Sequence, residues 1–186
     1  MNANKPAIAG RVIKVGAGHD VRTLRKASEI ARDGDVIEVD AGDYQGDTAV
    51  WTQNELVIRG TGTRPRVMAQ GQSAEGKAIF VVRGGSVTID NIGFFNARVA
   101  DRNGAGIRLE QGRLTIIRCA FEGNENGVLT SNEPTIELQV IDSTFVNNGA
   151  GDGYSHHLYA GSIAMLQVTG SYFGPAREGH LLKSRA

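Results

Sequence analysis

From about residue 35 to its end, the chain alternates between short runs of apolar and polar residues and bends rich in Gly and Asn. Runs such as SVTID, RLTII and ELQVI place an aliphatic residue at every second position, which is the period of a β-strand with one buried face. Glycine and asparagine suit the tight turns between such strands. The pattern therefore predicts a region built from short strands and turns.

The segment before residue 35 has a different pattern. RVIKV (Arg11 to Val15) predicts a short strand, and Asp20 can cap a helix after it. The apolar residues at helical spacing are Val21, Leu24, Ala27, Ile30 and Ala31, and Asp33-Gly34 ends the helix. Such an amphipathic helix would cover the exposed end of a stack of strands. We therefore expect a flexible N-terminus (1–10), a cap of one strand and one helix (11–34), and a strand region (35–186).

Four segments of the strand region align without gaps: SVTIDNIGFFNAR, RLTIIRCAFEGNENG, ELQVIDSTFVNNGAG and MLQVTGSYFGPAREG. They bring four phenylalanines to equivalent positions, Phe94, Phe121, Phe145 and Phe173. A second register aligns Ile107, Val128, Leu158 and Leu181. Repeats of about 20 to 30 residues made of short strands are typical of a solenoid, and the spaced leucines of a leucine-rich repeat are absent. The prediction is an all-β solenoid, a right-handed parallel β-helix of about six coils with an N-terminal amphipathic capping helix.

In such a fold, equivalent residues of successive coils lie above one another at a spacing of about 4.8 Å. The four phenylalanines are then expected to stack as an aromatic column in the core. Cys119 falls in an interior column and is interpreted as a small buried residue. The asparagines at the corners suit left-handed turns and can bond to neighbouring corners; they are Asn96, Asn124, Asn147 and Asn148.

Composition narrows the functional classes. Among the 186 residues, 20 Lys and Arg balance 20 Asp and Glu, so net charge gives no reason to expect a nucleic acid partner. The sequence has no apolar run of about 18 residues that would span a membrane, and MNANKPAIAG lacks the apolar centre of a signal peptide. A single cysteine excludes an internal disulfide and a multi-cysteine zinc site. The 25 glycines against 4 prolines indicate many tight corners.

The segment TLRKASEIARDGDVIEVDAGDY resembles the start of the pectin-lyase-like β-helix superfamily. More closely, segments such as NENGVLTSN, NNGAGDGYSHHLYAGSI and EGHLLKSRA resemble secreted bacterial right-handed β-helix repeat proteins, in which further coils follow. The resemblance implies carbohydrate-related work, mostly cleavage of acidic polysaccharides. It also implies that the chain is an N-terminal portion of a longer protein that is secreted or periplasmic.

The catalytic motifs of that superfamily are not reproduced. Its pectate lyases have a WIDH-like strand, whereas WTQN at Trp51 lacks the acid and the histidine. Its polygalacturonase-type hydrolases need paired aspartates and a GHG motif, of which GDG at Gly151 and GH at Gly179 are fragments.

The candidate site is the histidine-rich stretch from Gly151 to Ala186. Aligned on the second register, Gly106, Gly127, His157 and His180 share a column, and alternation places both histidines outward on successive rungs. The two glycines would leave space for a shallow groove. A lyase needs a base and a cation that neutralises the substrate carboxylate, so the predicted catalytic residues are His157, His180, Lys183 and Arg185. The predicted substrate-binding residues are Tyr159, Arg108, His156 and Asp152.

Alternatives to these roles stay open. The histidines and Tyr159 can decorate a wall by bonding to one another, and two histidines without a third ligand make a weak metal site. No cofactor is expected; Asp152 suits a turn, with a calcium or catalytic role as the alternative. Arg59, Arg83 and Arg108 would either form a basic strip or stand separately in solvent. Flat Thr-x-Thr rows are absent, which excludes an ice-binding β-helix.

Three functions therefore remain in competition. The first is a lyase-type enzyme on acidic polysaccharide. The second is a non-catalytic polysaccharide-binding β-helix in which Tyr159 and Trp51 stack on sugars. The third is a structural module that self-assembles, because LLKSRA ends the sequence within a coil and leaves an open rung. That rung predicts a homodimer through the C-terminal coil.

Overall fold

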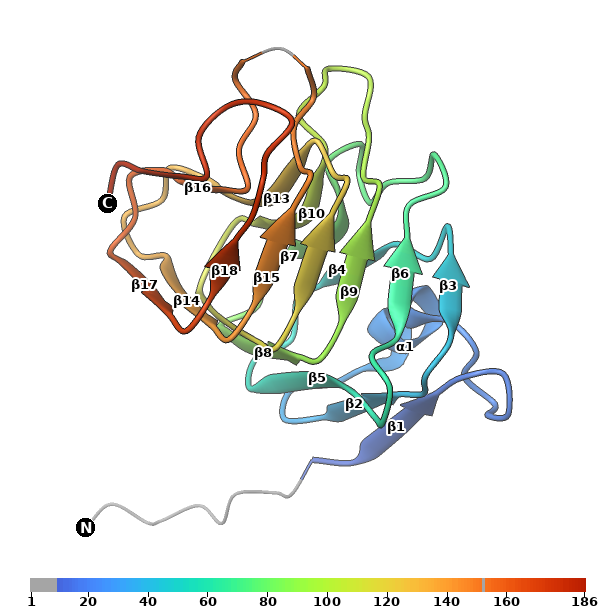
Figure 1. Cartoon of the computed structure of the whole chain (residues 1–186). Coiled ribbons are helices and arrows are strands. Elements are labelled where there is room, and N and C mark those ends of the chain that lie inside the picture. Colours follow the sequence, from blue (N-terminus) through green and yellow to red (C-terminus); the bar gives the residue numbers. More distant parts are fainter. Residues whose placement is uncertain (1–9, 152) are drawn as a thin grey trace, which may run out of the picture.

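The computed structural model describes residues 10–151 and 153–186 and shows a parallel β-solenoid of about six turns (Figure 1). Three parallel sheets form its walls, and one short helix lies near the N-terminus. The predicted fold class is thus confirmed. Sheet A contains β1 (Val12–Val15), β2 (Val36–Val39), β5 (Leu56–Gly60), β8 (Ser86–Asp90), β11 (Arg113–Ile117), β14 (Glu137–Ile141) and β17 (Met165–Thr169).

The other two sheets complete each coil. Sheet B contains β3 (Asp43–Gln45), β6 (Arg66–Met68), β9 (Gly93–Phe95), β12 (Ala120–Glu122), β15 (Thr144–Val146) and β18 (Tyr172–Phe173). Sheet C contains β4 (Ala49–Trp51), β7 (Ala78–Val82), β10 (Ala105–Leu109), β13 (Asn126–Thr130), β16 (Leu158–Ala160) and β19 (Leu182–Ser184). Each strand pairs with the equivalent strand of the next coil, so side chains line up in columns along the solenoid axis.

Helix α1 (Leu24–Ile30) closes the N-terminal end of the core. It buries Leu24 and Ala27. Its N-cap is Thr23, whose hydroxyl accepts a hydrogen bond from the Lys26 amide. The predicted cap, Asp20, is therefore wrong, because Val21 is drawn into a β-bridge with Val15 and the helix starts only afterwards.

The predicted aromatic column is confirmed. Phe94, Phe121, Phe145 and Phe173 stack with centroid separations of 5.1, 4.7 and 4.7 Å. Trp51 and Phe80 continue the aromatic core toward the N-terminus with edge-on contacts. Cys119 is fully buried, as expected, and burial raises the pKa of its thiol to about 12.

The corner asparagines divide into two groups. Asn96 and Asn147 have positive φ angles of 60° and 53°, the left-handed turns that the sequence predicts. Asn124 and Asn148 are buried and form a ladder: the Asn124 backbone amide and side-chain amide both donate to Oδ1 of Asn148, at 3.0 and 3.1 Å. The ladder satisfies backbone groups where sheet B turns into sheet C.

The register of sheet C differs from the predicted one in the last coil. Leu158 pairs with Leu182 rather than with Leu181. The alignment of β19 with β16 is therefore shifted by one residue from the predicted one. As a result, His180 lies in the same column as His156 and not in that of His157. Because side chains alternate along a strand, this shift changes which residues share a surface.

Two further predictions concern membrane spans and contact with a second copy of the chain. None of the helices in the described ranges is long and apolar enough to cross a membrane. Leu181 and Leu182 are exposed at the last rung. Coverage of that rung by a second copy of the chain stays a prediction.

Candidate functional site

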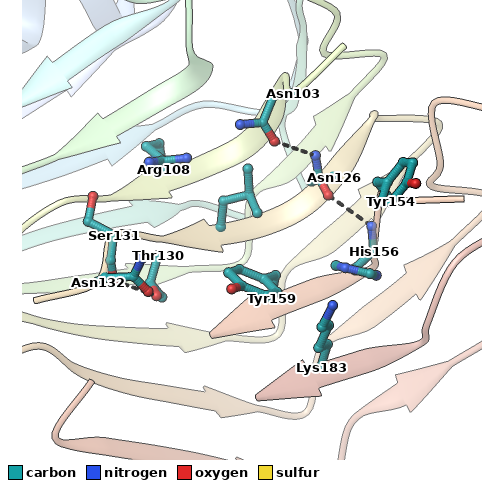
Figure 2. Close-up of a pocket in the computed structure, with 11 residues that line it drawn as sticks. Asn103, Arg108, Asn126, Thr130, Ser131, Asn132, Tyr154, His156, Tyr159 and Lys183 are labelled. Carbon is teal, nitrogen blue, oxygen red and sulfur yellow. Dashed lines mark hydrogen bonds between the residues drawn. The ribbon is translucent and has the colours of Figure 1, made fainter. Parts of the chain in front are cut away.

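A groove of about 400 Å³ runs across the outer face of sheet C, toward its C-terminal end (Figure 2). Its floor is a single outward row contributed by four successive strands. Arg108 of β10 pairs with Leu129 of β13, Leu129 pairs with Tyr159 of β16, and Tyr159 pairs with Lys183 of β19. The parallel register thus places two cations and an aromatic ring in one line, with Tyr159 two rungs from Arg108 and one rung from Lys183.

One wall of the groove is a hydrogen-bonded column at the corner that precedes sheet C (Figure 2). The Asn126 side-chain amide donates to Oδ1 of Asn103 at 3.4 Å, and the His156 backbone amide donates to Oδ1 of Asn126 at 2.8 Å. The His180 backbone amide donates to Nδ1 of His156 at 3.2 Å. This last bond leaves the proton of a neutral His156 imidazole on Nε2.

The opposite end of the groove is formed by Thr130, the last residue of β13, and by Ser131 and Asn132, which follow it. The Thr130 hydroxyl accepts a hydrogen bond from the Gly161 amide at 2.8 Å, and Oδ1 of Asn132 accepts one from the Ser162 amide at 3.0 Å. The turns of two successive coils are therefore locked together, and this end of the groove is preformed.

Tyr159 is the aromatic centre of the site. The His156 imidazole lies 5.6 Å from its ring, with 21° between the ring planes. The Lys183 ammonium and the Arg185 guanidinium lie 5.8 and 5.9 Å from the ring centroid. Both cations are thus within the range of a cation–π interaction, which gathers positive charge around this ring.

The groove has an uncompensated positive charge. Within the described residues, Arg108 and Lys183 form no ion pair, and no carboxylate lines the groove. The Nε of Arg108 is buried and has no hydrogen-bond partner among those residues. By contrast, Arg83 pairs with Glu75 and Glu110, and Arg59 pairs with Glu38. Of the two alternatives for Arg59, Arg83 and Arg108, the basic strip is not formed, since Arg59 lies on sheet A and Arg83 is neutralised.

His157 does not face the groove, contrary to the prediction. It is fully buried, its ring lies 6.3 Å from both Phe145 and Phe173, and it precedes β16 at the bend between sheets. Alternation does not hold at this bend. The column it occupies contains Gly106 and Gly127, where an added Cβ would come within 2.8 Å of the Phe121 and Phe145 rings respectively. The space beside these glycines is filled by phenylalanine and is not a groove.

Most of the other predicted site residues do come together. Tyr159, Arg108, His156 and Lys183 line the groove, and Arg185 lies beside it over Tyr159. His180 is exposed and lies beside His156 on the next coil, with 5.2 Å between the centroids of the two imidazole rings. Asp152 lies outside the described residues. Trp51, predicted to stack on sugars, is fully buried instead.

Sequence reasoning missed the amide side chains of the site, Asn103, Asn126 and Asn132. Asn126 and His156 follow one another in the same column, so the alignment of the second register contained that signal. Asn103 and Asn132 lie in turns, where strand periodicity carries no information.

No group of three His, Cys, Asp or Glu side chains that could hold a metal ion occurs among the described residues. No protein-family model, curated protein or solved structure matches the chain.

Proposed function

We propose that this protein binds an acidic polysaccharide in the groove on sheet C. The observation that carries the proposal is the row Arg108–Leu129–Tyr159–Lys183, which presents two unpaired cations on either side of an aromatic ring. A sugar ring can pack its apolar face on tyrosine, and amide side chains such as Asn103 can bond to its hydroxyls. The cations favour a sugar that carries a carboxylate or sulfate group.

Binding is favoured over hydrolysis of the polysaccharide. Glycoside hydrolysis uses two carboxylates on either side of the scissile bond, and the described lining of the groove contains none. The likeness of the sequence to pectin-lyase-like proteins supports a polysaccharide ligand, and it also supports export of the protein to the periplasm or beyond the cell.

A lyase reaction is the second candidate, favoured by the two cations that lie over Tyr159. In that reaction, Tyr159 would take the proton next to the carboxylate of a uronic acid, and Arg108 or Lys183 would stabilise the resulting negative charge. The glycosidic C–O bond then breaks, the departing oxygen takes up a proton, and a carbon–carbon double bond remains in the sugar. His156 is less suited as the base, because the His180 amide already occupies its Nδ1 lone pair.

Titration calorimetry with uronic acid oligosaccharides and with neutral oligosaccharides of equal length tests the proposal. We expect the acidic series alone to bind, and Lys183→Met and Arg108→Met each to weaken binding about tenfold or more. Lys14→Met, which removes an exposed lysine from sheet A, is the matched control and leaves affinity unchanged. Equal binding of neutral and acidic sugars, or no effect of either groove variant, would refute the proposal.

The same samples distinguish binding from catalysis. Ultraviolet absorbance of the unsaturated product is measured over time with the acidic oligosaccharides. Product formation that Tyr159→Phe abolishes without loss of affinity would establish the lyase. Saturable binding without product would establish a binding module.

A further inference from the structure

His157 ends the buried amide ladder at the corner between sheets B and C. The Asn148 side-chain amide donates to the Phe121 carbonyl at 3.1 Å and to Nδ1 of His157 at 2.8 Å. The Nε2 of His157 donates to the Gly174 carbonyl at 3.0 Å. One ring thus joins the ladder to the segment after β18, which belongs to the last coil.

These contacts require a neutral imidazole. Oδ1 of Asn148 accepts from Asn124, so its amide nitrogen must be the group that faces His157 as a donor. Nδ1 of the histidine is then unprotonated, and Nε2 carries the hydrogen that Gly174 accepts. Burial lowers the pKa of His157 below its ordinary value of 6.5, against the opposing effect of the Gly174 and Pro175 carbonyls.

A second proton on the ring would break this arrangement. Nδ1–H and the Asn148 amide would be two donors facing each other inside the core, next to phenyl rings. Two residues close to His157 in the chain form the groove: His156, which precedes it, lies in the wall, and Tyr159, two positions after it, is the aromatic centre. Displacement of His157 therefore displaces the wall and the aromatic centre of the site.

We propose that His157 is a pH-sensitive positioning residue, which holds the last coil and the groove in place while neutral and releases both when it takes up a proton. Its effect on ligand affinity rests on the proposed function, whereas its effect on the last coil does not. The expected behaviour is loss of an anionic ligand on acidification. This change in affinity is opposite to the one that charge alone would give, because protonation of imidazoles adds positive charge to the site and would strengthen binding of an anion.

Other titratable groups lie on the elements around His157. Arg177 and Glu178 are in the segment after β18, and Glu125 precedes β13. His156 is adjacent in the chain, and His180 lies on the next coil. Among the described residues, the His157 ring bonds to Asn148 and Gly174, also interacts with the Pro175 carbonyl, and forms no ion pair.

Hydrogen exchange of the whole chain, measured by mass spectrometry from about pH 7 to about pH 5, tests this role of His157. After correction for intrinsic exchange rates, we expect protection of residues 172–181 to fall about tenfold over this range, while protection of β8 and β11 does not change. In His157→Gln, which keeps an N–H to reach Gly174 and cannot titrate, protection of the segment should be independent of pH. His180→Gln, which removes an exposed histidine of the neighbouring coil, should behave as the parent.

An equal fall in protection in His157→Gln and in the parent would overturn the proposal. If His157→Gln does not fold, NMR titration of the parent imidazoles decides instead. Protonation of His157 that coincides with the loss of protection supports the proposed role, and protonation without such loss overturns the proposal. Affinity for a uronic acid oligosaccharide should decrease as the pH is lowered in the parent, and should not decrease in His157→Gln. If no oligosaccharide binds at any pH, the proposed function fails, and the exchange result still decides the role of His157.

Discussion

The phenyl rings of Phe121 and Phe145 stack with 4.7 Å between centroids and 10° between planes. Their strands, β12 and β15, pair in parallel with these two residues directly opposite each other. The stack therefore follows from the register between coils, and each interior ring contacts one neighbour above and one below. Such a column links the stability of a coil to that of the coils beside it.

Replacing Phe145 by alanine should destabilise the fold by about 3–5 kcal/mol, because it leaves a cavity between two rings and against His157. Urea unfolding followed by circular dichroism measures the change. Phe95→Ala is the control, since Phe95 is half-buried on the outer face of sheet B, where it packs against Arg66. Similar losses for the two variants would show that the column has no special role.

Gly127→Ala should cost about 1–3 kcal/mol, because an added Cβ would lie 2.3 Å from the His157 carbonyl oxygen and 2.8 Å from the Phe145 ring. Both neighbours are fixed by the core, so neither can move away cheaply. Gly18→Ala is the matched control, as no atom lies within 4 Å of its added Cβ, and its effect should stay within about 0.5 kcal/mol. Thermal unfolding of both variants beside the parent makes the comparison, and a neutral Gly127→Ala would contradict the packing argument.

The fold could be predicted because its columns repeat in the sequence. Phe94, Phe121, Phe145 and Phe173 mark one position in four coils, and strand alternation around them assigns the buried face. The last rung of sheet C gave no such marker. Leu181 and Leu182 are both apolar and either could continue the column of Leu158, so the alignment chose the wrong one.

The site was predictable where its residues lie inside strands. Arg108 and Tyr159 follow from alternation around the inward residues Ile107 and Leu158. Lys183 does not, because it faces outward only in the register of Leu182 and would face inward in the predicted register of Leu181. His157 could not be placed in this way, because it lies at a bend where two successive residues, His157 and Leu158, both point into the core. A histidine among phenylalanines needs the Asn148 amide and the Gly174 carbonyl, and neither partner is evident from spacing alone.

The loop between β6 and β7 is held by ionic groups and should respond to acid independently of His157. Ala74 packs on the outer face of sheet C with Val81 and Leu129, next to the groove. Glu75 fastens this loop, since it accepts hydrogen bonds from Arg83 and Lys77. Both cations also bond to Glu110, at 2.6 and 2.7 Å, so four charges form one network.

Hydrogen bonding to Arg83 lowers the pKa of Glu75 from 4.5 to about 2, outweighing the smaller effect of burial. A carboxylate with a lowered pKa stabilises the folded loop fully above its ordinary pKa, and this stabilisation disappears as the pH falls through about 2. We therefore expect hydrogen exchange of residues 70–77 to accelerate between about pH 4.5 and about pH 2 in the parent. Glu75→Gln should show fast exchange throughout, and Glu122→Gln, an exposed change on β12, should not. Constant protection of this loop down to about pH 2 in the parent would mean that Ala74 packing alone holds it, because the ionic network would then contribute nothing to its attachment.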